Sequence, residues 1–166
     1  YAQANFLLVN DTLLALQQVA AAHRRQFTLP VLGITGSNGK TVVKEWLYQL
    51  LWQDYHIVRS PKSYNSQVGV PLSVWQTNET HNLAIFEAGI SQPHEMERLQ
   101  AVIQPTIGLF TNIGAAHNEG FTGMEQKIFE KLQLFSRVQY LIYCADYSLI
   151  TQCIEQCRQL YPEQYR

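Results

Sequence analysis

A glycine-rich run followed by a lysine and a threonine is the segment of this sequence best suited to chemistry. Glycines stand at positions 33, 36 and 39, and Lys40 and Thr41 follow directly. Glycines allow a tight turn close to phosphate oxygens, and amides at a helix start point at an anion. Lys40 would reach the β- and γ-phosphates, and the Thr41 hydroxyl would bind Mg²⁺. We therefore expect a nucleoside triphosphate, ATP, at Gly36, Ser37, Asn38, Gly39, Lys40 and Thr41.

The spacing of the run departs from the common phosphate-loop pattern at one position. That pattern has a glycine five residues before Gly39, where this chain has Ile34 and reads G-x-x-G-x-x-G-K-T from Gly33. An ordinary turn between a strand and a helix is the alternative interpretation. The three spaced glycines, the Lys-Thr pair and the flanking apolar segments together favour phosphate binding.

Polar residues follow two other apolar segments that are typical of strands. Glu87 follows Leu83 to Phe86, and Asn112 and His117 follow Ile107 to Phe110. Ligands of α/β sheets bind beyond the carboxyl ends of the strands, so Glu87 is a candidate Mg²⁺ ligand there. A solvated acid is the alternative for Glu87. For His117, the residue type alone favours a hydrogen-bonding or surface role over a metal role.

Two further segments have an open interpretation on their residues alone. The polar stretch 59–69 either closes over a nucleotide or substrate or is a surface connector. Lys131 lies four residues after Lys127 on an expected helix, so one of the two should face the sheet edge. By spacing alone, a solvated lysine is the default expectation for Lys131.

Alternating strands and helices would position these residues. We predict strands over 31–35, 56–59, 83–87, 106–111 and 140–144. We predict helices over 11–24, 41–52, 70–76, 93–103, 124–135 and 148–160. The first helix would have Asp11 or Thr12 as its cap, and its apolar face would consist of Leu13, Leu14, Leu16, Val19 and Ala20. Short apolar strands alternating with helices predict a three-layer α/β fold, a mostly parallel sheet flanked by helices.

Length and composition indicate which classes of protein this chain could belong to. The 166 residues suit one domain, and the formal net charge of −1 gives no basic field for nucleic acid. No apolar run approaches the ~20 residues of a membrane span, and no signal-peptide pattern is visible. Three cysteines are too few for a disulfide framework, so we expect reduced thiols and a cytoplasmic protein. Because Tyr1 opens the chain, we expect a domain excised from a longer protein.

The run Gly33 to Thr41 resembles the ATP loop of the Mur ligases, the ATP-dependent amide-forming enzymes of bacterial peptidoglycan precursor synthesis. Segments 86–89, 111–117 and 130–132 fit the same family in the right order. Segments 64–72, 116–121 and 9–17 are most similar to the members that add D-alanyl-D-alanine to the UDP-N-acetylmuramoyl tripeptide. The resemblance covers nearly the whole chain and implies the P-loop NTPase-like central domain of such a ligase.

The resemblance also implies roles for particular residues. It implies that Lys40, His117 and Lys131 are catalytic, that Asn112 contacts the nucleotide, and that two Mg²⁺ ions are bound by Thr41, Glu87, His117 and Lys131. The lysine matching Lys131 is often carbamylated in the family, although Leu132 and Gln133 depart from the Gly-Glu pair that often follows it. Ser63, Asn65 and Ser66 would belong to a substrate loop.

The resemblance implies partners that lie outside this chain. A Mur ligase also has an N-terminal domain for the UDP sugar and a C-terminal domain, so we expect the isolated chain to bind nucleotide weakly and not to ligate. The alternatives are another Mur-type ligase, a folylpolyglutamate synthase, a P-loop switch or motor NTPase, and a non-catalytic nucleotide-binding module.

Overall fold

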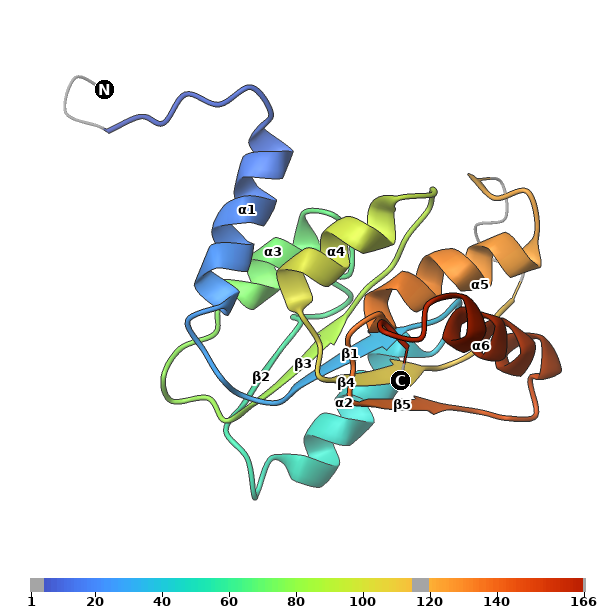
Figure 1. The fold of residues 1–166 in the computed structure, drawn as a ribbon. Coiled ribbons are helices and arrows are strands. Elements are labelled where there is room, and N and C mark those ends of the chain that lie inside the picture. Colours follow the sequence, from blue (N-terminus) through green and yellow to red (C-terminus); the bar gives the residue numbers. More distant parts are fainter. Residues whose placement is uncertain (1–4, 115–119, 166) are drawn as a thin grey trace.

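The central element of the fold is a sheet of five parallel strands. The computed structural model describes residues 5–114 and 120–165. In these residues the strand order is β2-β3-β1-β4-β5 (Figure 1). The strands are β1 Val31–Thr35, β2 Ile57–Arg59, β3 Leu83–Glu87, β4 Ile107–Phe110 and β5 Tyr140–Tyr143. Each predicted strand is present, with ends that differ by at most one residue.

Helices cover both faces of the sheet, which confirms the predicted three-layer α/β fold. They are α1 Thr12–Arg24, α2 Lys40–Leu51, α3 Gly69–Val74, α4 Glu95–Ile103, α5 Met124–Leu132 and α6 Ser148–Leu160, with a 3₁₀ turn, η2, at Gln133–Phe135. Figure 1 shows α2 on one side of the sheet and the other helices on the opposite side. No helix in the described ranges is long and apolar enough to cross a membrane.

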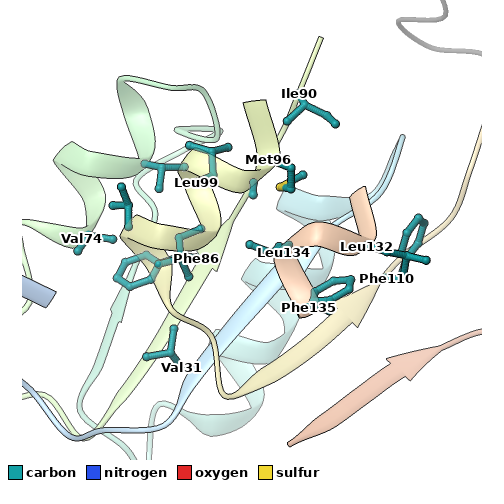
Figure 2. Packing of buried hydrophobic residues seen from close by; sticks show 14 of the residues in the cluster. Val31, Val74, Phe86, Ile90, Met96, Leu99, Phe110, Leu132, Leu134 and Phe135 are labelled. Atoms are coloured by element: carbon teal, nitrogen blue, oxygen red, sulfur yellow. The ribbon is translucent and has the colours of Figure 1, made fainter. Parts of the chain in front are cut away.

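Two hydrophobic cores lie on the two faces of the sheet. The larger one includes Phe86 of β3, Phe110 of β4 and Leu99 of α4 (Figure 2). The smaller one joins Ile34 and Ile85 of the sheet to half-buried side chains of α2. Every residue of β1 and β3 is buried, because both faces of these inner strands are covered. Burial on both faces explains why their sequences are apolar runs without alternation.

The apolar face predicted for α1 is partly wrong. Leu14 and Val19 are exposed, while Gln17 and Arg24 are buried. The buried polar groups are paired: Gln17 Nε2 donates to Gln67 Oε1 at 2.9 Å, and Arg24 Nε donates to the carbonyl of Ile103 at the end of α4 at 3.0 Å. Hydrogen bonds therefore allow these polar residues to face the protein interior.

A strained residue explains why α4 begins later than predicted. His94 has φ 66° and ψ 2°, a left-handed conformation that interrupts the helix before Glu95. A side chain with a Cβ adopts this conformation at a cost of about 1–2 kcal/mol, which glycine avoids.

We expect His94→Gly to raise the free energy of unfolding by about 1 kcal/mol, because glycine removes the left-handed strain. Urea unfolding of the chain measures the change. His94→Ala is the matched control, since it removes the imidazole but keeps the Cβ, and it should give no gain. A glycine variant less stable than the alanine variant would contradict the strain at this position.

Candidate functional site

The phosphate-loop sequence lies at the carboxyl edge of the sheet, between the end of β1 and the start of α2. Gly36 has φ 144° and Gly39 has φ 79°. A Cβ on Gly36 would approach Thr111 Oγ1 to 2.0 Å, so only glycine fits at this position. Gly39 is the residue immediately before α2. The loop therefore turns directly from the central strand into a helix, as phosphate binding requires.

Ile34 belongs to the strand and not to the turn. It is fully buried in the smaller core, and in the sheet it is paired with Glu87 of β3 and Leu109 of β4. The position at which the common pattern has glycine is therefore filled by a core residue, and the turn begins at Gly36.

The segment after β4 holds the loop by hydrogen bonds. The Ser37 amide donates to the Asn112 carbonyl at 2.9 Å, and the Asn38 amide donates to Asn112 Oδ1 at 3.0 Å. The Gly114 amide donates to Ser37 Oγ at 3.0 Å. In this structure Asn112, which the sequence analysis expects at the nucleotide, supports the backbone of the phosphate loop.

Three lysines converge on the carbonyls of the two loops. Lys40 Nζ and Lys131 Nζ both donate to the carbonyl of Gly36, at 2.9 and 3.3 Å. Lys127 Nζ donates to the carbonyl of Gly114 at 2.7 Å. Lys127 and Lys131 are 1% and 3% exposed, so the solvated side chain expected for Lys131 from spacing alone is wrong, and both lysines are buried where one was expected to face the sheet edge. The side of α5 that carries them faces the sheet, which buries their stems.

Burial and mutual repulsion lower the pKa values of these lysines. Burial, followed by the charges of Lys40 and Lys127, lowers the pKa of Lys131 to about 7. Burial also lowers the pKa of Lys40, with the charge of Glu87 opposing the effect. A buried group of cations is stabilised by an anion, so this arrangement favours a negatively charged ligand.

Glu87 at the end of β3 is a fully buried carboxylate beside the phosphate loop. The Thr41 hydroxyl donates to Glu87 Oε2 at 2.9 Å, and Lys44 Nζ donates to Oε1 at 3.0 Å. Carboxylate and hydroxyl oxygens are ligands that Mg²⁺ prefers, so the pair Thr41 and Glu87 fits a magnesium ion next to bound phosphates.

The expected substrate loop approaches the same carboxylate. Asn65 Nδ2 donates to Glu87 Oε2 at 3.5 Å, and the Gly89 amide donates to the Asn65 carbonyl at 2.8 Å. Ser66 Oγ accepts from the Gly69 amide at 3.1 Å, while Ser63 is exposed. This stretch is therefore bound to β3 and is not a free surface connector.

One cavity of about 330 Å³ is lined by the phosphate loop, the loop around Asn65 and the two lysines of α5. It is lined by Gly36, Ser37, Lys40, Asn65, Ser66, Gln67, Val68, Gly89, Ile90, Ser91, Glu95, Lys127 and Lys131. His117 lies outside the described residues, and within the described ranges no three His, Cys, Asp or Glu side chains gather as a metal site would require. The structure thus brings together Lys40, Lys131 and Asn65 around one space.

Lys44 is a buried residue of the site that the sequence analysis missed. It lies four residues after Lys40, and its side chain is fully buried against Glu87. The signal was present in the sequence, because Lys44, Leu47 and Leu51 recur at helical spacing and so share the inward face of α2.

Comparison with known proteins gives consistent matches. Residues 34–163 match the Mur ligase middle domain. A UDP-N-acetylmuramoyl-tripeptide–D-alanyl-D-alanine ligase of Synechocystis sp. is 40% identical over 123 residues, covering 74% of this chain and 27% of that protein. The crystal structure of MurF from Acinetobacter baumannii has a TM-score of 0.79 at 27% identity, covering 90% of this chain and 35% of that chain. MurF ligase from Thermotoga maritima in complex with ADP also has a TM-score of 0.79, at 25% identity, covering 95% and 36%.

The chain spans between 27% and 36% of the length of these three relatives. The matched range begins within β1 and ends after α6, so it contains the phosphate loop, Glu87 and Lys131. The chain belongs to the Mur ligase family, and residues 34–163 correspond to its middle domain.

Proposed function

We propose that this chain is the ATP-binding domain of a MurF-type ligase, which adds D-alanyl-D-alanine to UDP-N-acetylmuramoyl-tripeptide in the bacterial cytoplasm. Relatives that are 40% and 38% identical to this chain are named for this activity, and a similar structure holds ADP. The observation that carries the proposal is one cavity lined both by the phosphate loop and by residues of the Asn65 loop, residues 60–68. We infer that a phosphate donor and a carboxylate acceptor meet there.

The chemistry that we propose has two steps. The terminal carboxylate of the tripeptide attacks the γ-phosphorus of ATP, which forms an acyl phosphate and releases ADP. The amine of D-alanyl-D-alanine then attacks the acyl carbon, which forms the amide and releases phosphate and a proton. Phosphoryl transfer needs positioning and charge neutralisation more than covalent help.

The residues of this chain fit those requirements. Lys40 and the loop amides would hold the β- and γ-phosphates, and Lys127, which also lines the cavity, would add positive charge beside them. Thr41 and Glu87 would hold one Mg²⁺, and His117 and Lys131 a second. Bound Mg²⁺ would supply further neutralisation of the phosphate charge. Flanking domains of the longer chain would bind the UDP sugar and the incoming amine.

Phosphate release by the full-length ligase tests this function. We expect release from ATP only when both UDP-N-acetylmuramoyl-tripeptide and D-alanyl-D-alanine are present, with the ligated product seen by mass spectrometry. A folylpolyglutamate substrate pair serves as the control for the related ligase class. Hydrolysis of ATP that neither substrate pair changes would contradict a ligase and favour a P-loop switch or motor.

Lys40→Ala should weaken binding of ADP with Mg²⁺ by about 10- to 100-fold, because a charge-assisted hydrogen bond to phosphate is lost. Calorimetric titration of the full-length ligase measures the change. The exposed Lys62 provides a matched control, and Lys62→Ala should bind as the parent does. Equal affinity of the Lys40 variant and the parent would show that the nucleotide binds elsewhere.

We also propose that Lys131 is carbamylated in the active enzyme. CO₂ adds to the neutral amine, with loss of a proton, and the product is an anionic carbamate. A pKa of about 7 leaves much of the Lys131 amine neutral at physiological pH, whereas an ordinary lysine is almost wholly protonated. The carbamate would replace one positive charge of the lysine group with a negative charge that can bind a metal.

The pKa shift sets the direction of the pH dependence of carbamylation. As pH rises from 6 to 8 across a pKa of about 7, the neutral fraction of Lys131 rises from roughly a tenth to roughly nine-tenths. At a fixed partial pressure of ¹³CO₂, the carbamate signal in a ¹³C NMR spectrum should rise with it. Lys131→Met should lack this signal and Lys62→Met should keep it. A signal that is absent at every pH would contradict the modification.

A further inference from the structure

We propose that Lys44 is a positioning residue that fixes Glu87 and the loop at residues 60–69 relative to the phosphate loop. This inference rests on the proposed function of Glu87 as a magnesium ligand. Lys44 lies on α2, one helical turn beyond Lys40, and its side chain has no solvent exposure. No part of the proposed two-step chemistry uses its charge.

The ammonium of Lys44 donates to three oxygens, two of which belong to the buried residues Ser60 and Glu87. Nζ donates to the Ser60 carbonyl at 2.7 Å, to Glu87 Oε1 at 3.0 Å and to the Lys62 carbonyl. The Glu45 carboxylate lies 3.3 Å away and is itself paired with Arg59. A full set of acceptors leaves this ammonium one preferred position.

The hydrogen bond from Lys44 engages one oxygen of Glu87 and leaves the other oxygen nearer to Thr41. Lys44 donates to Oε1 at 3.0 Å, and the Thr41 hydroxyl lies 2.9 Å from Oε2 and 3.2 Å from Oε1. Thr41 is the loop residue expected at Mg²⁺. Lys44 thereby holds the carboxylate in the rotamer that turns Oε2 toward Thr41, on the side of the phosphate loop.

The same ammonium also anchors the entrance of the Asn65 loop. Its bonds to the carbonyls of Ser60 and Lys62 lie where β2 passes into that loop, and Ser60 Oγ accepts from the Glu87 amide at 3.2 Å. Three residues after Lys62, Asn65 Nδ2 donates a hydrogen bond to Glu87 Oε2. One cation therefore links α2, β3 and the loop that lines the cavity.

Stability alone gives little reason for a buried lysine at this position. Removing two charges from water is costly, and replacement of a buried ion pair by apolar residues of similar size is often neutral or stabilising. Position 44 faces inward on a helix whose neighbouring inward residues, Val43, Leu47 and Leu51, are apolar. The geometric constraint on Glu87 and the loop is what an apolar residue could not supply.

The test is the enhancement of ADP affinity by Mg²⁺ in the full-length ligase. For each protein, the Kd of ADP is measured by calorimetry with EDTA and with Mg²⁺, and the ratio of the two is the enhancement. We expect Lys44→Met to reduce this ratio by about 10- to 100-fold, the usual effect of losing a residue that orients a metal ligand. The Kd in EDTA should stay within about twofold of the parent.

A double-mutant cycle separates positioning through Glu87 from a general structural effect. In a Glu87→Gln background, Lys44→Met should have no further effect on the ratio, because the ligand that it orients is gone. Arg137→Met, at an exposed cation outside the site, is the matched control and should leave the ratio unchanged. An unchanged or raised ratio in Lys44→Met, or an equal loss of affinity with and without Mg²⁺, would overturn the proposal.

A second variant and the parent ligase distinguish failure of the positioning role from failure to fold and from failure of the proposed function. If Lys44→Met does not fold, Lys44→Gln carries the same test, since its amide still donates to the loop carbonyls but lacks the charge. Failure of the parent ligase to bind ADP at all would count against the proposed function. Normal Mg²⁺ enhancement in a folded Lys44 variant would instead count against the positioning role alone.

Discussion

A carboxylate that is cut off from water constrains the whole site. Glu87 has no solvent exposure, so its charge must be compensated by the protein around it. Thr41, Lys44 and Asn65 supply the hydrogen bonds; Thr41 and Lys44 belong to α2, and Asn65 belongs to the facing loop. Because α2 and the facing loop both bind the carboxylate at the end of β3, satisfying one buried charge also fixes the relative positions of these segments.

Positively charged side chains gather in the lining of the cavity. Three ammonium groups lie near two loops, and two of them share a single carbonyl, that of Gly36. Burial, together with the repulsion of the nearby charges of Lys40 and Lys127, lowers the pKa of Lys131 to about 7. Lys40, Lys127 and Lys131 therefore present positive charge to the cavity, whereas Glu87 is not among the residues that line it. An anionic ligand in the cavity would compensate this charge.

Most of the fold could be predicted from the sequence, because the inner strands are apolar runs and the helices have clear periods. The phosphate loop was equally clear, since its chemistry is local. Spacing failed where a polar side chain is buried with a distant partner: Gln17 meets a loop 50 residues away, and Lys44 meets Glu87. For Lys131, spacing alone indicated a solvated lysine, and only the family resemblance suggested a role in the site. Helical spacing could place Lys44 on the inward face of α2, but the partner of a buried polar side chain depends on tertiary contacts that no local pattern contains.

The strand order also has a consequence for synthesis on the ribosome. β1 lies between β3 and β4, and the backbone of the phosphate loop is held by Asn112 and Gly114, more than 70 residues further along the chain. A nascent chain that has emerged only as far as β3 has the loop sequence but not the contacts that shape it. Since segments with non-local contacts form late, nucleotide capture must follow the emergence of β4. At that point the domain still lacks α5, β5 and α6, so ATP could stabilise later stages of folding but could not template the first half of the domain.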